Sequence, residues 1–319
     1  MRADHFTFTA ADWTPLFVYR WLPDNPDETK AVVHIAHGLS EHGGRYVKLA
    51  EWLTEHGYAV YCNDQRGHGQ SALKAEDLGH FADADGWNLL AQDLAQMCIE
   101  EKQAYEGLPI ILLGHSMGAL LAQRLVYEQP DLFDAVAMSG PNGKLDPMVG
   151  IGKTIAKFER FRLGARGRSR LINQLSFGGY NKHFPNATTP FDWLSREATE
   201  VARYVNDPKC GFIATTQSWV DMLTGLPALH DPANHARIRR DLPLYLFGGH
   251  RDPVNAFGRG LELLVETYRK VGIRSIRHRL YPDARHEVFN ETNRAEVFHD
   301  LLEWLDLIRV QVGEKILMA

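Results

Sequence analysis

Residues 114–118 read Gly114-His115-Ser116-Met117-Gly118, and this stretch decides the fold. It follows the apolar run at residues 110–113 and opens a segment, residues 117–128, whose apolar spacing predicts an amphipathic helix. A serine on a sharp strand-to-helix turn has a strained backbone, so the residues two positions away on each side must be small. The turn presents the hydroxyl above the sheet, at the positive end of the helix dipole. This context predicts that Ser116 is a nucleophile.

On both sides of this turn, short apolar runs alternate with helix-length segments. The apolar runs are residues 32–36, 58–62, 110–113, 135–138, 243–247 and 276–281. The segments between and after them predict helices at residues 46–56, 87–105, 117–128, 261–271 and 294–309. An opening hairpin is expected from residues 5–9 and 16–21. The alternation predicts an α/β fold with a mostly parallel central sheet flanked by helices on both faces.

The alternation of predicted strands and helices stops between residues 142 and 240, where the sequence predicts a mostly helical insertion rich in bulky apolar residues. Because the insertion lies between two strands of the sheet, we expect it to form a cap over the nucleophile. The predicted organisation is a core domain built from residues 1–141 and 241–319, with the helical cap at residues 142–240.

A serine hydroxyl needs a general base, and the base needs an acid that orients it. On a sheet with this type of turn, the acid and the histidine follow the serine in chain order, each after a later strand. Asp252 and His286 follow the last two predicted strands in that order. Asp241 precedes its strand, and Asp283 is too close in sequence to His286 to reach the far side of its ring. We therefore expect Asp252 as the acid and His286 as the general base.

Acyl transfer also needs hydrogen-bond donors aimed at the oxyanion of the tetrahedral intermediate. The first is expected to be the backbone N–H of Met117, which follows the nucleophile, and the second should come from the loop after the run at residues 32–36. We assign the second donor to Leu39. Gly38 allows the backbone to turn so that this N–H points inward.

Composition excludes several other classes of protein. Hydrophobic residues make up 45% and charged residues 24%, which is typical of a folded globular chain. The formal net charge of −5 argues against a nucleic-acid partner, because neutralising phosphates needs a basic surplus. No stretch has the pattern of a signal peptide or a membrane span, and no metal-binding motif occurs. The cysteines are Cys62, Cys98 and Cys210, which are odd in number and widely spread. This pattern favours a reducing compartment, so we expect a cytoplasmic location.

Three stretches carry a resemblance to a known family: HGLSEHGGRY at residues 37–46, NDQRGHGQS at residues 63–71 and GHSMGA at residues 114–119. They resemble monoacylglycerol lipases and the lysophospholipase-like bacterial hydrolases related to them, a group similar to serine aminopeptidase-like hydrolases. The resemblance implies the α/β-hydrolase fold and hydrolysis of single-chain lipid esters through an acyl-enzyme on Ser116. It implies a small-molecule lipid ester as the partner and no metal or organic cofactor.

The same resemblance implies that Glu41 and Arg45 contact substrate, since residues at these motif positions line the pocket for the alcohol part of the ester. A structural ion pair that braces the oxyanion loop is the alternative. Phe289 departs from the pattern, because eukaryotic members tend to carry a polar residue three positions after the catalytic histidine. This departure weakens the case for glycerol as the leaving alcohol.

Other functions remain open at this level. A general carboxylesterase or a thioesterase would use the same catalytic residues. A proline-type aminopeptidase is less favoured, because such enzymes use an oxyanion loop richer in glycine than residues 37–44. A non-catalytic ligand-binding protein on this fold would be expected to lack part of the catalytic set.

A basic cluster interleaved with aromatic residues lies inside the predicted cap, at Arg160, Arg162, Arg166, Arg168 and Arg170. Such a cluster is typical either of transient contact with an anionic membrane surface or of an ordinary solvated face.

Overall fold

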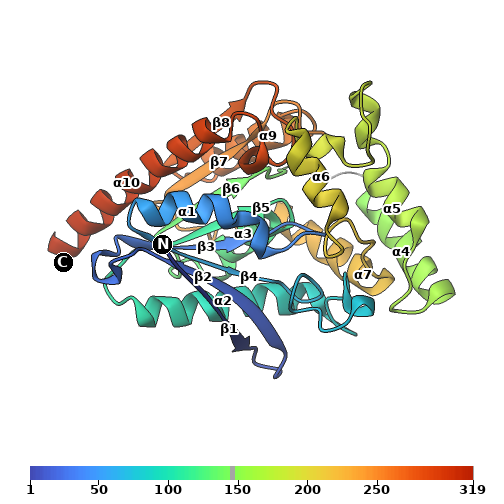
Figure 1. The fold of residues 1–319 in the computed structure, drawn as a ribbon, viewed down its shortest axis with the longest axis horizontal. Coiled ribbons are helices and arrows are strands. Elements are labelled where there is room, and N and C mark those ends of the chain that lie inside the picture. The colour runs from blue at the N-terminus through green and yellow to red at the C-terminus, as the bar shows by residue number, and fades with distance from the viewer. Residues whose placement is uncertain (144–147, 319) are drawn as a thin grey trace.

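The computed structural model describes residues 1–143 and 148–318, with the backbone alone for residues 313–318. An eight-stranded sheet lies at its centre, in the order β1-β2-β4-β3-β5-β6-β7-β8 (Figure 1). Its strands are β1 (Arg2–Thr9), β2 (Pro15–Leu22), β3 (Ala31–Ala36), β4 (Tyr58–Asn63), β5 (Ile110–His115), β6 (Ala135–Ser139), β7 (Leu244–Gly249) and β8 (Ile276–Tyr281). Strand β2 is antiparallel to β1 and β4, and every other neighbouring pair is parallel. The predicted hairpin and mostly parallel sheet are confirmed.

Helices cover both faces of this sheet. Helices α1 (Val47–Glu55) and α10 (Arg294–Met318) pack on one face, and α2 (Gly86–Ala104), α3 (Met117–Glu128) and α9 (Arg259–Lys270) pack on the other. Strands β3 to β7 are buried along their whole length, as two covered faces require. Helix α10 continues past Arg309, its predicted end, and runs through Gly313 to Met318.

Between β6 and β7 the chain forms a group of elements that we call the insertion. It consists of α4 (Val149–Leu163), α5 (Arg170–Phe177), α6 (Ala198–Asn206), α7 (Thr216–Gly225), α8 (Pro232–His235) and the 3₁₀ turns Tyr180–His183, Asp192–Leu194 and Leu226–His230. Helices α4 to α7 gather at one end of the molecule, away from the C-terminus (Figure 1). Helix α4 packs on α7, whereas α8 packs on α3 of the core. The part of the insertion remote from the sheet is therefore α4 to α7.

Four short 3₁₀ helices lie outside the insertion, at Pro26–Glu28, Gly43–Tyr46, Ala75–Asp77 and Val288–Asn290. In the part of the chain that the structure describes, no helix has both the length and the apolar character needed to cross a membrane.

Candidate active site

Ser116 sits on the turn between β5 and α3 with φ 52° and ψ −113°, a conformation that non-glycine residues rarely adopt. A Cβ at Gly118 would lie 1.9 Å from the carbonyl oxygen of Ala36, and one at Gly114 would lie 2.4 Å from the carbonyl oxygen of Gly118. Both distances are much shorter than a van der Waals contact, so neither position can carry a side chain. The strained serine and its two small neighbours are therefore as the sequence pattern predicts.

Asp252 and His286 come together at the ends of β7 and β8. The imidazole Nδ1 of His286 lies 2.8 Å from Oδ2 of Asp252, and the other carboxylate oxygen accepts the Val254 N–H at 2.8 Å. Both side chains are buried. The two competing aspartates lie elsewhere, since Asp241 pairs with Arg239 and Asp283 is exposed.

Burial alone would lower the pKa of His286, but the charge and hydrogen bond of Asp252 outweigh it and raise this pKa above the ordinary 6.5. The bond to Asp252 holds a proton on Nδ1, so Nε2 of the neutral ring is the basic nitrogen. Ser116 and His286 line the same cavity. No hydrogen bond joins these two side chains among the described residues, as is common before substrate binds.

The two expected oxyanion donors are both available. Within the described residues, the N–H groups of Leu39 and Met117 donate to no acceptor. Leu39 lines the cavity, and Met117 directly follows the nucleophile. Unpartnered N–H groups next to the nucleophile in the chain and in the wall of the same cavity are what a developing oxyanion needs.

The loop that carries Leu39 is braced by Glu41. One oxygen of this carboxylate accepts the Gly38 N–H at 2.6 Å and the Tyr46 hydroxyl at 2.8 Å, and the other accepts from Arg45 at 2.7 Å. A Cβ at Gly38 would lie 2.9 Å from the Glu41 carboxylate and 3.2 Å from the Cβ of Ser116. Gly38 therefore occupies a position where the backbone must approach the nucleophile closely.

Arg45 joins this loop to the histidine loop. Its guanidinium donates to both carboxylate oxygens of Glu287 at 2.6 Å, in addition to Glu41, and its Cζ lies 4.8 Å from the ring centre of Tyr204. Glu41 and Glu287 line the cavity that contains Ser116 and His286, whereas Arg45 lines a separate groove outside it. Glu287 was not singled out by the sequence analysis, although it directly follows His286.

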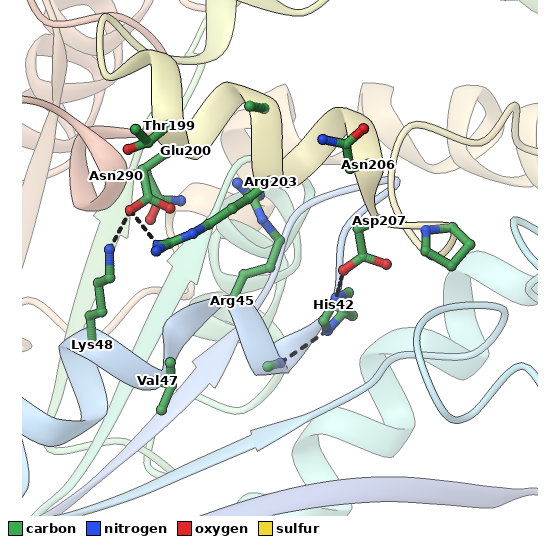
Figure 2. Close-up of a pocket in the computed structure, with 13 residues that line it drawn as sticks. His42, Arg45, Val47, Lys48, Thr199, Glu200, Arg203, Asn206, Asp207 and Asn290 are labelled. Carbon is green, nitrogen blue, oxygen red and sulfur yellow. Dashed lines mark hydrogen bonds and ion pairs between the residues drawn. The ribbon is translucent and has the colours of Figure 1, made fainter.

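The outer groove has a volume of about 810 Å³ and runs between α6 and the start of α1 (Figure 2). Apart from Arg45, whose partners lie outside the groove, several of its charged side chains are paired with one another. Glu200 bridges Lys48 and Arg203, and His42 contacts Asp207 at 2.9 Å. These pairs join the insertion to the core beside the oxyanion loop.

Ser40 is the point where the insertion contacts the oxyanion loop most directly. Its carbonyl oxygen accepts the Tyr204 hydroxyl and the Gly211 N–H, each at 2.9 Å, and its own hydroxyl donates to the carbonyl of Phe212 at 2.8 Å. Ser40 has a positive φ of 61° and directly follows Leu39. The sequence offered no signal for these contacts, because their partners lie more than 160 positions away.

The cavity above Ser116 is small, with a volume of about 90 Å³. Its aromatic lining comes from the insertion, at Phe177, Phe191, Trp193, Tyr204 and Phe212. Sites for drug-sized ligands usually measure about 300–1,000 Å³. In this conformation the cavity accommodates a small acyl group, and a longer chain requires the lining of the insertion to move.

Three further histidines near the site are buried and held neutral. Burial lowers the pKa of His37 and of His68 to about 3 and that of His115 to about 4. His37 donates to the Gly38 carbonyl at 2.8 Å and accepts the Gln65 N–H at 3.0 Å. These contacts fit a supporting role rather than proton transfer.

The loop at residues 64–71 is held by hydrogen bonds of a structural kind. Asp64 accepts the N–H groups of Gly43 and Gln70 at 2.7 and 2.6 Å, and the Ser71 hydroxyl donates to the Asp64 carbonyl at 2.6 Å. Through the bond from the Gly43 N–H to Asp64, this loop supports the segment that follows Leu39.

Phe289 does not line the cavity but packs in the core against Tyr46, Phe247 and Phe298. The position three residues after His286 is thus occupied by an apolar core residue, which offers no polar contact to an alcohol.

Two groups of residues in the described chain carry the donor atoms of a metal site: His34, Cys98 and Glu101, and His42, Asp207 and Cys210. Neither includes a triad residue. His34 contacts Glu101 and Asn63 through its two nitrogens, and His42 contacts Gly44 and Asp207 in the same way. Both imidazoles are satisfied by protein partners, and we assign no metal to either group.

Comparison with known proteins places this geometry in context. A family described as serine aminopeptidase, S33, matches residues 27–293. The chain is 28% identical over 290 residues to a monoacylglycerol lipase of Mycolicibacterium smegmatis, with 89% of this chain and 90% of that protein covered. It is 27% identical over 293 residues to the human monoglyceride lipase, with 89% and 87% covered.

Solved structures share the fold. A thermostable carboxyl esterase from Bacillus coagulans superposes with a TM-score of 0.87 at 21% identity, covering 97% of this chain and 99% of that one. A monoglyceride lipase variant from Saccharomyces cerevisiae superposes with a TM-score of 0.76 at 21% identity, covering 96% and 95%.

Proposed function

Because the chain belongs to the serine aminopeptidase S33 family of α/β-hydrolases, we propose that it hydrolyses carboxylic esters bearing one acyl chain, with Ser116, His286 and Asp252 as the catalytic triad. The observation that carries the proposal is the bond between His286 and Asp252 in the cavity that a strained Ser116 also lines, together with the unpartnered N–H groups of Leu39 and Met117 among the described residues. Relatives named monoacylglycerol lipase and lysophospholipase support a lipid ester as the substrate.

The reaction proceeds in two steps. His286 removes the proton from the Ser116 hydroxyl as its oxygen attacks the ester carbonyl, and the N–H groups of Leu39 and Met117 stabilise the oxyanion. Collapse of this intermediate breaks the bond to the alcohol, which leaves with the proton from His286. A water molecule, deprotonated by the same histidine, then attacks the acyl-enzyme and releases the fatty acid. Asp252 keeps the imidazole in the tautomer that both steps need.

Residues 142–240 act as a cap in this proposal, and the described residues among them supply most of the apolar surface above Ser116. Each methylene that the pocket buries contributes about 0.8 kcal/mol, so catalytic efficiency should rise with acyl-chain length until the pocket is full. The three acyl chains of a triacylglycerol would not fit in one such pocket. We therefore expect monoesters to be preferred over triacylglycerols.

A general short-chain carboxylesterase is the second candidate, and the cavity volume of about 90 Å³ favours it. The two candidates differ in whether the insertion moves to admit a long chain. An amide substrate is less favoured than either, because an amine is a poorer leaving group than an alcohol.

Kinetics on monoesters from acetyl to oleoyl test the proposal, with triolein and a proline amide as controls. A monoacyl-lipid hydrolase should reach its highest kcat/KM with a medium or long chain. An optimum at acetyl would identify the short-chain esterase, and a preference for the proline amide would contradict both candidates.

We further propose transient contact of the cap with an anionic membrane surface. Large apolar side chains on α4 and α5 are exposed, among them Phe158 (62%), Phe161 (88%) and Leu175 (62%). Of the basic cluster, Arg162 pairs with Glu159 and Arg166 with Asp77, and Arg168 donates to two backbone carbonyls. Part of the cluster is thus structural, whereas Arg160 and Arg170 are exposed near the apolar side chains.

Co-sedimentation with phosphatidylglycerol vesicles tests this contact, with phosphatidylcholine vesicles and the Phe161→Ser variant as controls. We expect binding that depends on anionic lipid and is weakened in the variant. Equal recovery of both proteins in the supernatant would contradict it.

A cytoplasmic location is proposed on the state of the thiols. Cys62, Cys98 and Cys210 are unpaired and buried. Proteins that keep all their cysteines free are typical of reducing compartments.

A further inference from the structure

Among the described residues, the cavity that contains Ser116 is lined by acidic side chains but by no lysine or arginine. The acidic side chains are the carboxylates of Glu41 and Glu287. The cation that compensates them, Arg45, lines the outer groove instead (Figure 2).

One guanidinium is shared between these two carboxylates. Arg45 bonds Glu41 at 2.7 Å and Glu287 at 2.6 Å through the same NH1 nitrogen, and its NH2 bonds Glu287 again. Burial alone would raise the pKa of Glu41, but Arg45, His115 and the Gly38 N–H hold it below its usual value. The group therefore leaves one net negative charge beside the reacting atoms.

This charge lies next to the place where the alcohol departs. In the proposed mechanism His286 gives its proton to the leaving oxygen, so the alcohol part must lie against the His286 ring. Glu287 is the next residue in the chain, and Glu41 is two positions after Leu39. In a single-chain lipid the acyl chain is uncharged, so the alcohol part is the only one whose charge these carboxylates can sense.

We propose that Glu287, together with Glu41, is a specificity determinant that makes the enzyme reject esters whose leaving alcohol carries a negative charge, such as a phosphate. The preferred substrates are esters of uncharged alcohols. This inference rests on the proposed ester hydrolysis at Ser116. Charges inside a poorly solvated cavity interact much more strongly than in water, so we expect a discrimination of roughly tenfold or more in kcat/KM.

Three octanoyl esters that differ in the alcohol provide the test: monooctanoylglycerol, octanoyl lysophosphatidic acid and octanoylcholine. They are used below their critical micelle concentrations, so that the basic cluster on the cap does not meet a charged aggregate. We expect the wild type to hydrolyse the neutral and cationic esters at least tenfold more efficiently than the anionic one.

Glu287→Gln removes the charge and keeps a carbonyl acceptor for Arg45, and we expect it to narrow this ratio several-fold. Glu287→Asp keeps the charge. It should retain the ratio of kcat/KM between neutral and anionic esters even if its shorter side chain loosens the ion pair with Arg45. Glu266→Gln, which removes an exposed carboxylate on α9, is the remote control and should match the wild type. Glu41 is not used, because its carboxylate also holds the Gly38 N–H.

A second readout is the pH dependence of kcat/KM for the neutral ester. Burial lowers the pKa of His286, and Asp252 raises it by more. The carboxylate of Glu287 adds to the increase that Asp252 causes. Glu287→Gln should therefore shift the acidic limb to lower pH, an effect that lost packing alone does not predict.

Equal wild-type efficiency on the neutral and anionic esters would overturn the inference, as would an unchanged ratio in folded Glu287→Gln. A Glu287→Asp variant that loses discrimination as Glu287→Gln does would also overturn it. Failure of all three esters, with no labelling of Ser116 by a fluorophosphonate, would instead reject the proposed function itself.

Discussion

The hydroxyl of Tyr204 lies 2.9 Å from the carbonyl oxygen of Ser40, and through this bond helix α6 holds the residue that follows Leu39, the proposed oxyanion donor. The Gly211 N–H binds the same oxygen. Ser40 has a left-handed backbone, which costs free energy and persists only where the surrounding structure imposes it. The insertion thus contributes to the alignment of the Leu39 N–H as well as to the roof of the cavity.

We expect Tyr204→Phe to lower kcat roughly three- to tenfold with little change in KM, because the ring remains but the Ser40 carbonyl loses one of its two donors. Tyr105→Phe is the matched control, since its hydroxyl bonds Tyr61 away from the site. Steady-state kinetics on one monoester would compare the two variants. Equal kcat values would show that Gly211 alone holds the loop.

Gly38→Ala should lower kcat by about a hundredfold, the order seen when one oxyanion donor is lost. The added methyl group would lie 2.9 Å from the Glu41 carboxylate and 3.2 Å from the Cβ of Ser116, so the loop must shift. Gly152→Ala in α4 is the control, because its methyl group has 3.8 Å of clearance and alanine favours a helix. If Gly38→Ala keeps wild-type turnover, the Leu39 N–H is not the donor.

Ser116→Ala should abolish ester hydrolysis while the protein remains folded, as judged by its thermal unfolding. Asp252→Asn should lower kcat by up to about ten-thousandfold, by analogy with the serine-protease template, because the wrong histidine tautomer is favoured. Asp283→Asn serves as the control, since Asp283 is exposed. Near wild-type turnover of Asp252→Asn would mean that another carboxylate is the acid.

The acidic limb of kcat/KM against pH should have its midpoint above 6.5. His286 acts as a base when neutral, and although burial lowers its pKa, the interaction with Asp252 raises it overall. Activity is therefore lost as pH falls through this raised value. In Asp252→Asn the residual activity should show a limb at lower pH, where burial alone dominates. A wild-type midpoint below 6.5 would contradict the assigned electrostatics.

Several elements could be predicted from the sequence because each depends on neighbouring residues. The turn at Ser116 follows from Gly114 and Gly118, and the strands from their apolar runs. Asp252 and His286 could be placed because each follows a strand in a fixed chain order.

Other features depend on contacts between distant segments and could not be predicted in this way. The pairing of Glu287 with Arg45 spans 242 positions, and that of Tyr204 with Ser40 spans 164. The cavity volume depends on how far the insertion closes over Ser116, which no local pattern specifies. The end of α10 was placed too early, at Arg309, because no sequence signal marks where that helix stops.

The direct pairing of β6 with β7, with Val136 opposite Leu244, has a consequence for protein engineering. The two strands meet whatever chain connects them, so a cap from another hydrolase could be grafted between them without disturbing the sheet. Such a chimera would, however, lack the donors that Tyr204 and Gly211 present to Ser40. Cap exchange in this scaffold should therefore alter turnover as well as selectivity, unless the oxyanion loop is transplanted together with its cap.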